Sequence, residues 1–183
     1  MKSECFCISY KNNIGSFTIK TNQYIPLFHP ILSLTKKQIK PKDIEDELRH
    51  YSIELSKKDH VELLDNKVIF VNHKPLFFYH EGKLVPTLHN IIKHPSLLKQ
   101  IVVDMGAVRF VVSGADIMRP GIVEIEAGIS AGDFVVVVDM QHKKPLAVGI
   151  VLYGSAEMQE MKIGKVIKNV HYVGDTVWKV GST

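Results

Sequence analysis

The chain has little of the chemistry that marks common enzymes, secreted proteins and membrane proteins. Its 183 residues include two cysteines and one tryptophan. Cys5 and Cys7 are separated by a single residue, and neighbours this close rarely reach disulfide geometry. The longest apolar runs, such as 134–138, are far too short to span a bilayer. The N-terminus has no sustained apolar core of the signal-peptide kind. We therefore expect a reducing, cytoplasmic setting and no membrane partner.

Sequence patterns of nucleophilic, nucleotide-binding and metal chemistry are also missing. We find no GxSxG, Walker or dinucleotide-binding fingerprint. The nine histidines show no HExxH spacing, and the cysteines show no CxxC spacing. A zinc site made by Cys5, Cys7 and a distant histidine is the alternative, although ordinary surface and turn histidines explain the pattern better. The expectation is no catalytic residue, no metal and no cofactor.

The composition is that of a globular protein with a mild basic excess. Hydrophobic residues make up 45% and charged residues 23% of the chain, and the net charge is +4. Residues 1–95 hold 14 Lys and Arg against 10 Asp and Glu, whereas residues 96–183 hold nine of each. Much of the excess lies in one lysine cluster: Lys36, Lys37, Lys40 and Lys42. This cluster fits either a contact with nucleic acid or a solvated approach to a helix, and both interpretations stay open.

Residues 1–98 predict an α+β domain. Short strand-like pieces and an apolar loop with two prolines occupy 1–35. Residues 41–51 predict a helix, because acidic residues cluster in its first turn, where the helix dipole favours them. Residues 60–88 alternate between apolar and polar side chains and contain three turn signals, which predicts an antiparallel meander. Residues 89–101 predict one or two helical turns broken at a proline.

Within the predicted meander, residues 76–79 (LFFY) are apolar on both faces. In a strand Leu76 and Phe78 point to one side, and Phe77 and Tyr79 point to the other. Apolar character on both faces indicates burial on both, either within the chain or against a partner. We favour packing between the two domains.

Residues 99–183 predict a small, mostly β barrel. Several short strand-like segments with closely spaced turn signals follow one another, as in small barrels. Residues 155–161 predict a short helix, and residues 176–180 predict the closing strand. The domain boundary is expected near 95–101, which divides the chain into domains 1–98 and 99–183.

The stretch 104–122 predicts a short helix followed by an interrupted strand. Asp104 can cap the helix, and Gly114 fits the left-handed position that ends one. Pro120 and Gly121 interrupt the next strand, which marks it as an edge or bulged strand. The predicted inward face of the helix is Met105, Val108, Val111 and Val112. From the residues alone, caps and turns of a tight barrel are favoured over a nucleic-acid contact.

This stretch, DMGAVRFVVSGADIMRPGI, closely resembles the signature of the PUA domain, an RNA-binding module first described in pseudouridine synthases and archaeosine transglycosylases. The segments AGDFVVVVD, KPLAVGIV, SAEM and GKVIKNVHYVGDTVWKV follow in the order of that family, so the resemblance covers about residues 101–180. Residues 74–104 resemble the segment that precedes this domain in the MCT/translation-machinery-associated proteins, and the whole arrangement resembles their short archaeal members. Residues 1–35 match that pattern poorly.

The resemblance implies a pseudo-barrel whose first helix and following strand form an RNA groove. The matching positions are Gly106, Ala107, Arg109, Gly114, Ala115, Met118, Arg119, Pro120 and Gly121. The small residues are expected to admit the RNA backbone. Arg109 and Arg119 are expected to supply charge or a bidentate fork to a phosphate or a base edge. The last strand, near Tyr172 and Trp178, is expected to flank the groove, with Trp178 in the core rather than stacked on a base.

The implied function is non-catalytic RNA binding in translation initiation, reinitiation or recycling. The expected partners are structured RNA (tRNA or small-subunit ribosomal RNA), the small ribosomal subunit and an initiation-factor-like protein. The residues upstream of the barrel are too few for the catalytic domain of the modification enzymes. The alternative is an RNA-binding accessory or specificity subunit of an enzyme of the pseudouridine synthase or archaeosine transglycosylase type. A third interpretation is a protein-interaction module with no RNA role.

Overall fold

The structure, a computed structural model, describes residues 10–12, 15–17 and 35–181. The chain forms two compact units, Met1–Ser33 and Leu34–Thr183. In the first unit, β1 (Tyr10–Asn12) and β2 (Gly15–Phe17) form an antiparallel pair. The other predictions for residues 1–35, including those for the two cysteines and the apolar loop, lie outside the described residues.

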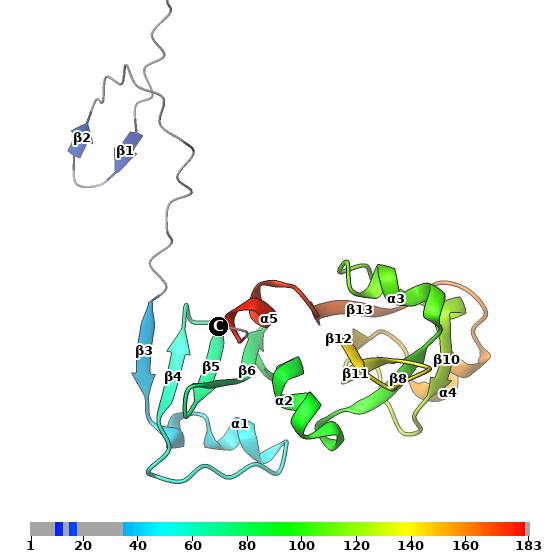
Figure 1. The fold of residues 1–183 in the computed structure, drawn as a ribbon, viewed down its shortest axis with the longest axis horizontal. Helices are drawn as coiled ribbons and strands as arrows, with labels where there is room; N and C mark the ends of the chain where they lie inside the picture. The colour runs from blue at the N-terminus through cyan, green and yellow to red at the C-terminus, as the bar shows by residue number, and fades with distance from the viewer. Residues whose placement is uncertain (1–9, 13–14, 18–34, 182–183) are drawn as a thin grey trace, which may run out of the picture. The chain divides into compact units, whose positions relative to one another are not determined.

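The second unit begins with a five-stranded antiparallel sheet in the order β3-β4-β5-β6-β7 (Figure 1). Its strands are β3 (Lys36–Ile39), β4 (Val61–Leu64), β5 (Val68–Val71), β6 (Lys74–His80) and β7 (Lys83–Pro86). The predicted meander is therefore confirmed. Its turns use residues that tolerate positive φ, such as Asn66 (52°), Asn72 (49°) and Gly82 (75°).

Short helices flank this sheet. The predicted helix 41–51 is wrong as a single element, because it is divided into a 3-10 turn η1 (Pro41–Asp43) and α1 (Glu45–Arg49). Ile44 lies between them with φ −124°, which is not helical. Further along, α2 (Leu88–Lys93) is followed by the 3-10 turn η2 (Pro95–Leu97), as the proline predicted.

A six-stranded mixed sheet follows, in the order β10-β8-β11-β12-β13-β9. Its strands are β8 (Lys99–Val103), β9 (Ile117–Met118), β10 (Ile122–Ile125), β11 (Phe134–Asp139), β12 (Pro145–Val151) and β13 (Lys165–Tyr172). Strands β8 and β11 are parallel, and the other pairs are antiparallel. The two edge strands β9 and β10 are joined only by the 3-10 turn η3 (Arg119–Gly121), so the sheet curls until its edges meet. This curled sheet is the expected pseudo-barrel.

Three helices accompany the curled sheet: α3 (Met105–Val111), α4 (Ser155–Glu160) and α5 (Thr176–Val180). The predicted closing strand at 176–180 is wrong, because this segment is the helix α5. Asp175 explains the difference: its Oδ1 accepts a hydrogen bond from the Trp178 amide at 2.7 Å and so caps the helix. Among the described residues, no helix is long and apolar enough to cross a bilayer.

Burial follows the faces of the two sheets. The interior of the curled sheet is lined by residues such as Ile101, Val137 and Ile167. Within the first sheet, Phe77 packs in a cluster of its own domain. Its neighbour Phe78 points the opposite way into a cluster that also contains Leu88 of α2 and Val136 and Val148 of the curled sheet. The prediction of interdomain packing for residues 76–79 is therefore confirmed for Phe78 alone, because Phe77, Leu76 and Tyr79 pack within their own domain.

Candidate nucleic-acid interface

The N-terminus of α3 is fastened to η3 by its capping residue. Asp104 accepts a hydrogen bond from the Ala107 amide on Oδ1 at 2.9 Å, which confirms it as the N-cap. Its own amide donates to the carbonyl of Gly121 at 2.9 Å. A β-carbon added at Gly121 would lie 3.1 Å from Cβ of Ala107. Ala107 and Gly121 therefore allow α3 and η3 to approach closely, so these small residues serve the packing of the protein itself.

The C-terminus of α3 is fastened to β13. Gly114 has φ +87°, as predicted for a residue that ends a helix. A β-carbon there would lie 2.7 Å from Cε1 of Tyr172. The Asn169 amide Nδ2 donates to the carbonyls of Val111 and Ala115, at 3.0 and 3.1 Å. Tyr172 thus packs against the residue that ends α3, and Ala115 next to that residue is exposed.

The next candidate residues lie on the strand β9 and at the start of η3. Met118 is 50% exposed and lies opposite Lys165 of β13 in the register. The amide of Arg119 donates to the carbonyl of Gly164 at 2.8 Å. The guanidinium of Arg119 is half-buried, with Nε donating to the carbonyl of Met158 and Nη1 donating to that of Ile122 at 3.0 Å. Two of its donors are therefore committed, one to α4 and one to the start of β10.

Arg109 has the opposite environment. Its side chain is exposed on α3, and its guanidinium carbon lies 4.6 Å from the ring centre of Phe110. No carboxylate of the described residues pairs with it. Phe110 itself is 53% exposed. An exposed arginine beside an exposed aromatic ring can bind a phosphate and stack on a base.

The predicted inward face of α3 is partly wrong. Val111 is buried, and Val108 and Val112 pack against the barrel core, as predicted. Met105, the first residue of the helix, is 42% exposed instead. Sequence reasoning also missed Phe110, although its absence from the predicted apolar face is a signal that could have identified it as an exposed aromatic residue.

The structure brings the sequence-derived candidates together on α3, β9 and η3, which we call the α3–β9 surface. Exposed members are Gly106, Arg109, Ala115, Met118 and Pro120, and half-buried members are Ala107, Gly114, Arg119 and Gly121. Trp178 does not belong to this surface. It lies on α5 and stacks on His89 with ring centres 4.2 Å apart, so the preference for core packing over base stacking agrees with its environment.

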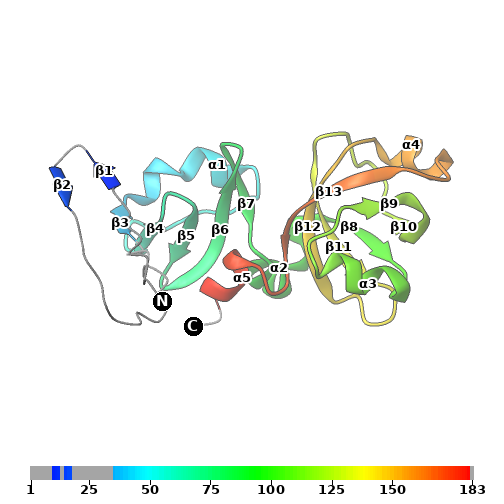
Figure 2. The ribbon, with the colours of Figure 1, turned by 90° about the horizontal axis from the view of Figure 1, so that it is seen from above.

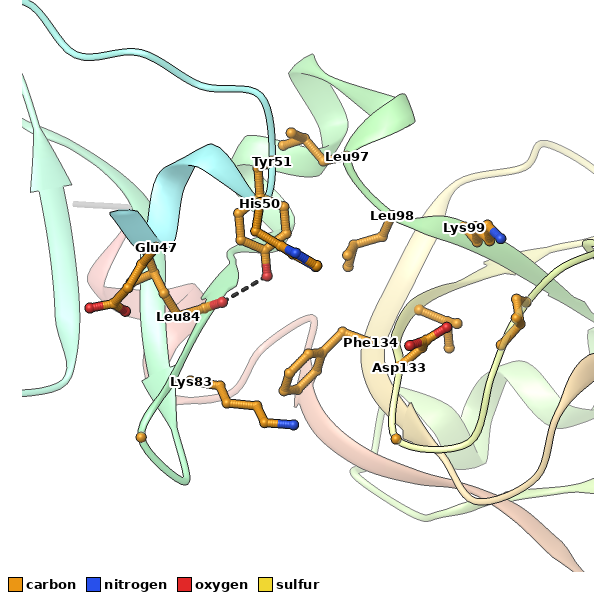
Figure 3. Close-up of a pocket in the computed structure, with 14 residues that line it drawn as sticks. Glu47, His50, Tyr51, Lys83, Leu84, Leu97, Leu98, Lys99, Asp133 and Phe134 are labelled. Atoms are coloured by element: carbon orange, nitrogen blue, oxygen red, sulfur yellow. Dashed lines mark hydrogen bonds between the residues drawn. The ribbon is translucent and has the colours of Figure 1, made fainter. Parts of the chain in front are cut away.

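A cavity of about 590 Å³ opens elsewhere, between the two sheets (Figure 3). Lys83 and Phe134 face it from opposite sides. Burial, together with the charge of Glu47, raises the pKa of Tyr51 to about 12, and its hydroxyl donates to the carbonyl of Leu84 at 2.7 Å. The cavity also contains acidic and apolar side chains, so its chemistry does not select an anion such as a phosphate.

The remaining sequence candidates are less informative. Lys36 and Lys37 lie exposed on the edge strand β3, and Lys40 and Lys42 lie exposed at η1. Lys36 Nζ is 3.8 Å from a carboxylate oxygen of Glu62. In residues 10–12, 15–17 and 35–181, no three His, Cys, Asp or Glu side chains are arranged to hold a metal ion.

Comparison with known families assigns both halves of the second unit. Residues 99–173 match the PUA domain, and residues 33–94 match a domain of unknown function (DUF1947). A crystal structure of a hypothetical protein from Pyrococcus horikoshii is similar in fold, with a TM-score of 0.70 and 32% identity. The similarity covers 80% of this chain and 99% of that chain.

Two curated relatives are similar over most of their length. An uncharacterized protein of Methanocaldococcus jannaschii is 41% identical over 150 residues, which cover 79% of this chain and 93% of the relative. Translation machinery-associated protein 20 of Saccharomyces cerevisiae is 32% identical over 155 residues, which cover 79% of this chain and 82% of the relative. With its α+β domain, its curled sheet and this extent of similarity, the chain belongs to the family of PUA-domain proteins that includes translation machinery-associated protein 20.

Proposed function

We propose that this protein is a non-catalytic factor that binds structured RNA through the α3–β9 surface and acts in translation. Two observations support the proposal at the level of the family: the chain carries a PUA domain, a module for RNA binding, and a relative is named for its association with the translation machinery. The observation that carries it at the level of residues is the exposed guanidinium of Arg109, which has no carboxylate partner among the described residues and lies beside the exposed ring of Phe110.

In this proposal the two arginines have different roles. Arg109 contacts a phosphate or the edge of a base, and Phe110 stacks on an unpaired base at a helix end. Arg119 mainly supports the wall of the surface, because two of its donors already bind main-chain carbonyls. Gly106, Ala115 and Pro120 leave the backbone accessible, while Met118 supplies an apolar contact.

The proposed targets are the ends of RNA helices, as in a tRNA acceptor stem or a hairpin of small-subunit ribosomal RNA. Double-stranded RNA is read mainly by its shape and its 2′-hydroxyls, with sequence read where bases are unpaired. We propose that the protein works in the cytoplasm on the small ribosomal subunit during initiation, reinitiation or recycling. The N-terminal α+β domain is the proposed site for an initiation-factor-like protein partner.

An accessory or specificity subunit of an RNA-modification enzyme is the second candidate, because the PUA module also suits that role. Co-purification from cells separates the two. Small ribosomal subunits in the purified material support the translation role, whereas a pseudouridine synthase or transglycosylase supports the alternative. A protein-interaction module without RNA binding predicts no shift of tRNA or ribosomal hairpins in gels.

The decisive variant is Arg109→Glu. Because Arg109 has no carboxylate partner among the described residues, reversing its charge should leave the fold intact and weaken RNA affinity at least about tenfold at low salt. Gel-shift titrations with tRNA and small-subunit hairpins measure the affinity. Arg49→Glu on α1 is the matched control, because Arg49 is also exposed and lies in the other domain. Equal RNA affinity for wild type and Arg109→Glu would show that the α3–β9 surface is not the binding site.

A further inference from the structure

A row of lysines follows the exposed side of β13. Lys165 and Lys168 are both exposed, while Val166 and Ile167 between them are fully buried. An uninterrupted strand would place residues three apart on opposite faces. The register shift between Lys165 and Ile167, typical of a β-bulge, places both lysines on the outside. At its first end the row meets the α3–β9 surface, because Lys165 lies opposite Met118.

At its other end the row continues onto the five-stranded sheet. The ammonium group of Lys168 lies 3.0 Å from Oε1 of Glu81, in the turn between β6 and β7. Lys83 follows this turn as the first residue of β7. Lys67 lies beside the neighbouring end of β6, since its carbonyl accepts a hydrogen bond from the Tyr79 amide at 2.7 Å. The hydrogen bond from Lys168 is the largest cause that holds the pKa of Glu81 below its ordinary value. The charges of Lys168 and Lys83 lower this pKa further. Figures 1 and 2 show β13 running from the curled sheet toward α5 and the first sheet.

We propose that these four lysines, Lys165, Lys168, Lys67 and Lys83, bind the phosphate backbone of the same RNA helix whose end occupies the α3–β9 surface. We call them the β13 strip. The inference rests on the proposed RNA binding and extends its footprint from the PUA domain to the N-terminal domain. A duplex backbone is the occupant that fits, because its series of phosphates matches a row of exposed lysines.

The carboxylates that pair with lysines of the β13 strip determine how substitutions there should change RNA affinity. Lys165 lies 3.2 Å from Asp116, and Lys168 lies 3.0 Å from Glu81. Exposed ion pairs of this kind contribute little to stability, so either lysine can exchange its carboxylate for a phosphate at small cost. The carboxylates left behind then repel the RNA. Removing a lysine should therefore weaken binding, while removing its acidic partner should strengthen it.

The test compares Lys168→Gln with Glu81→Gln in the full chain. It uses two RNA hairpins with the same loop and helix end, with stems of about 20 and about 6 base pairs. On the long stem, Lys168→Gln should weaken affinity about three- to tenfold and lower the salt slope by about one, while Glu81→Gln should strengthen affinity about two- to threefold. Both variants should bind the short stem as wild type does. Lys57→Gln, an exposed lysine at the opposite end of the first sheet, is the control and should change nothing.

The outcomes separate the strip from the function on which it rests. If Lys168→Gln and Glu81→Gln weaken binding equally, their pair is a structural tether and the strip is wrong. If wild type binds the long and the short stem with equal affinity, RNA binding by the β13 strip is also contradicted, but RNA binding by the α3–β9 surface is not. If neither hairpin binds wild type, the proposed RNA binding itself fails. If Lys168→Gln loses binding to ribosomal subunits but binds naked RNA as wild type does, the β13 strip contacts a protein instead.

Discussion

Gly114 shows how one residue serves both the helix end and the packing of the barrel. Its φ of +87° lies in the left-handed region, where a side chain costs about 1 kcal/mol. The position is also crowded, since a β-carbon there would lie 2.7 Å from the ring of Tyr172. The backbone requirement was predictable from the Ser-Gly-Ala sequence after a helix. The crowding was not, because Tyr172 comes from a strand much later in the chain.

The residue-scale prediction is that Gly114→Ala destabilises the fold more than Gly132→Ala does. Gly132 has nearly the same φ, +88°, but a β-carbon there would meet nothing within 4 Å. We expect a loss in the free energy of unfolding of about 1 kcal/mol for Gly132→Ala and about 2–4 kcal/mol for Gly114→Ala, because overpacking adds to the backbone strain. Urea denaturation measures both. Equal losses would mean that the Tyr172 ring moves aside without cost.

At the scale of elements, η3 depends on a side chain that sequence reasoning assigned to RNA. Arg119 ties η3 to α4 through the carbonyl of Met158 and to β10 through the carbonyl of Ile122. From the sequence alone, an arginine that follows a strand and precedes Pro-Gly is expected to be an exposed charge at the edge of the RNA groove. The carbonyl of Met158 lies in an element about 40 residues later, and only the curled sheet brings the two together.

We expect Arg119→Ala to act on stability before it acts on RNA binding. The variant leaves two carbonyls without their donor, which should lower the free energy of unfolding by about 1–3 kcal/mol. Hydrogen exchange should show the loss of protection first at the end of α4 and in β10. Arg109→Ala is the control, with unchanged protection in the same amides. If Arg119→Ala keeps wild-type stability and loses RNA affinity, the expectation of an exposed charge at the edge of the RNA groove is correct after all.

The segment 176–180 illustrates how element type can be misjudged. Its pattern, TVWKV, has the β-branched and aromatic residues of a strand. In the structure it is a helix, since Asp175 caps it and Trp178 stacks on His89 of α2. Five residues are too few for local propensity to decide between helix and strand. Packing of Trp178 against His89 of the other domain favours the helix.

At the scale of the whole molecule, the two sheets are joined by a buried histidine. His171 on β13 is fully buried, and its Nε2 accepts a hydrogen bond from the amide of Leu88 on α2 at 3.2 Å. Since that nitrogen accepts, the proton of the neutral ring lies on Nδ1, which donates to Asp175 Oδ2 at 2.8 Å. The hydrogen bonds therefore connect α2, β13 and α5 at the seam, the place where the two sheets pack together. The apolar cluster that contains Phe78 and Val148 lies next to them.

This arrangement predicts a pH dependence of stability. Burial alone would raise the pKa of Asp175, but hydrogen bonds from His171 and from the amides of Trp178 and Tyr172 outweigh burial and hold this pKa below its ordinary value. A carboxyl with a lowered pKa stabilises the folded state fully above its ordinary value, and that contribution is lost as pH falls through the lowered pKa. We expect Asp175→Asn to be about 1–2 kcal/mol less stable than wild type at neutral pH.

The difference between Asp175→Asn and wild type should shrink as the pH falls below about 4, because protonation removes the same charge from wild type. Urea denaturation at a series of pH values from neutral to about 3 measures it. Asn still caps α5, so the helix itself is preserved. Asp46→Asn, an exposed acid of α1, is the control. Parallel stability curves for wild type and Asp175→Asn would contradict the role of the Asp175 charge at the seam.

By itself, the sequence determined the features that depend on neighbours in the chain. These include the Asp104 cap, the left-handed Gly114, the break at Pro95 and the alternation of the meander, because hydrogen bonds and backbone sterics act over a few residues. The ordered motifs also identified the family. Tertiary structure alone decided the rest: the commitment of Arg119 to α4, the exposure of Phe110, the helical state of α5 and the lysine row that crosses from β13 to Glu81. Those features depend on contacts between residues far apart in sequence, which exist only after the sheet curls and the two sheets pack together.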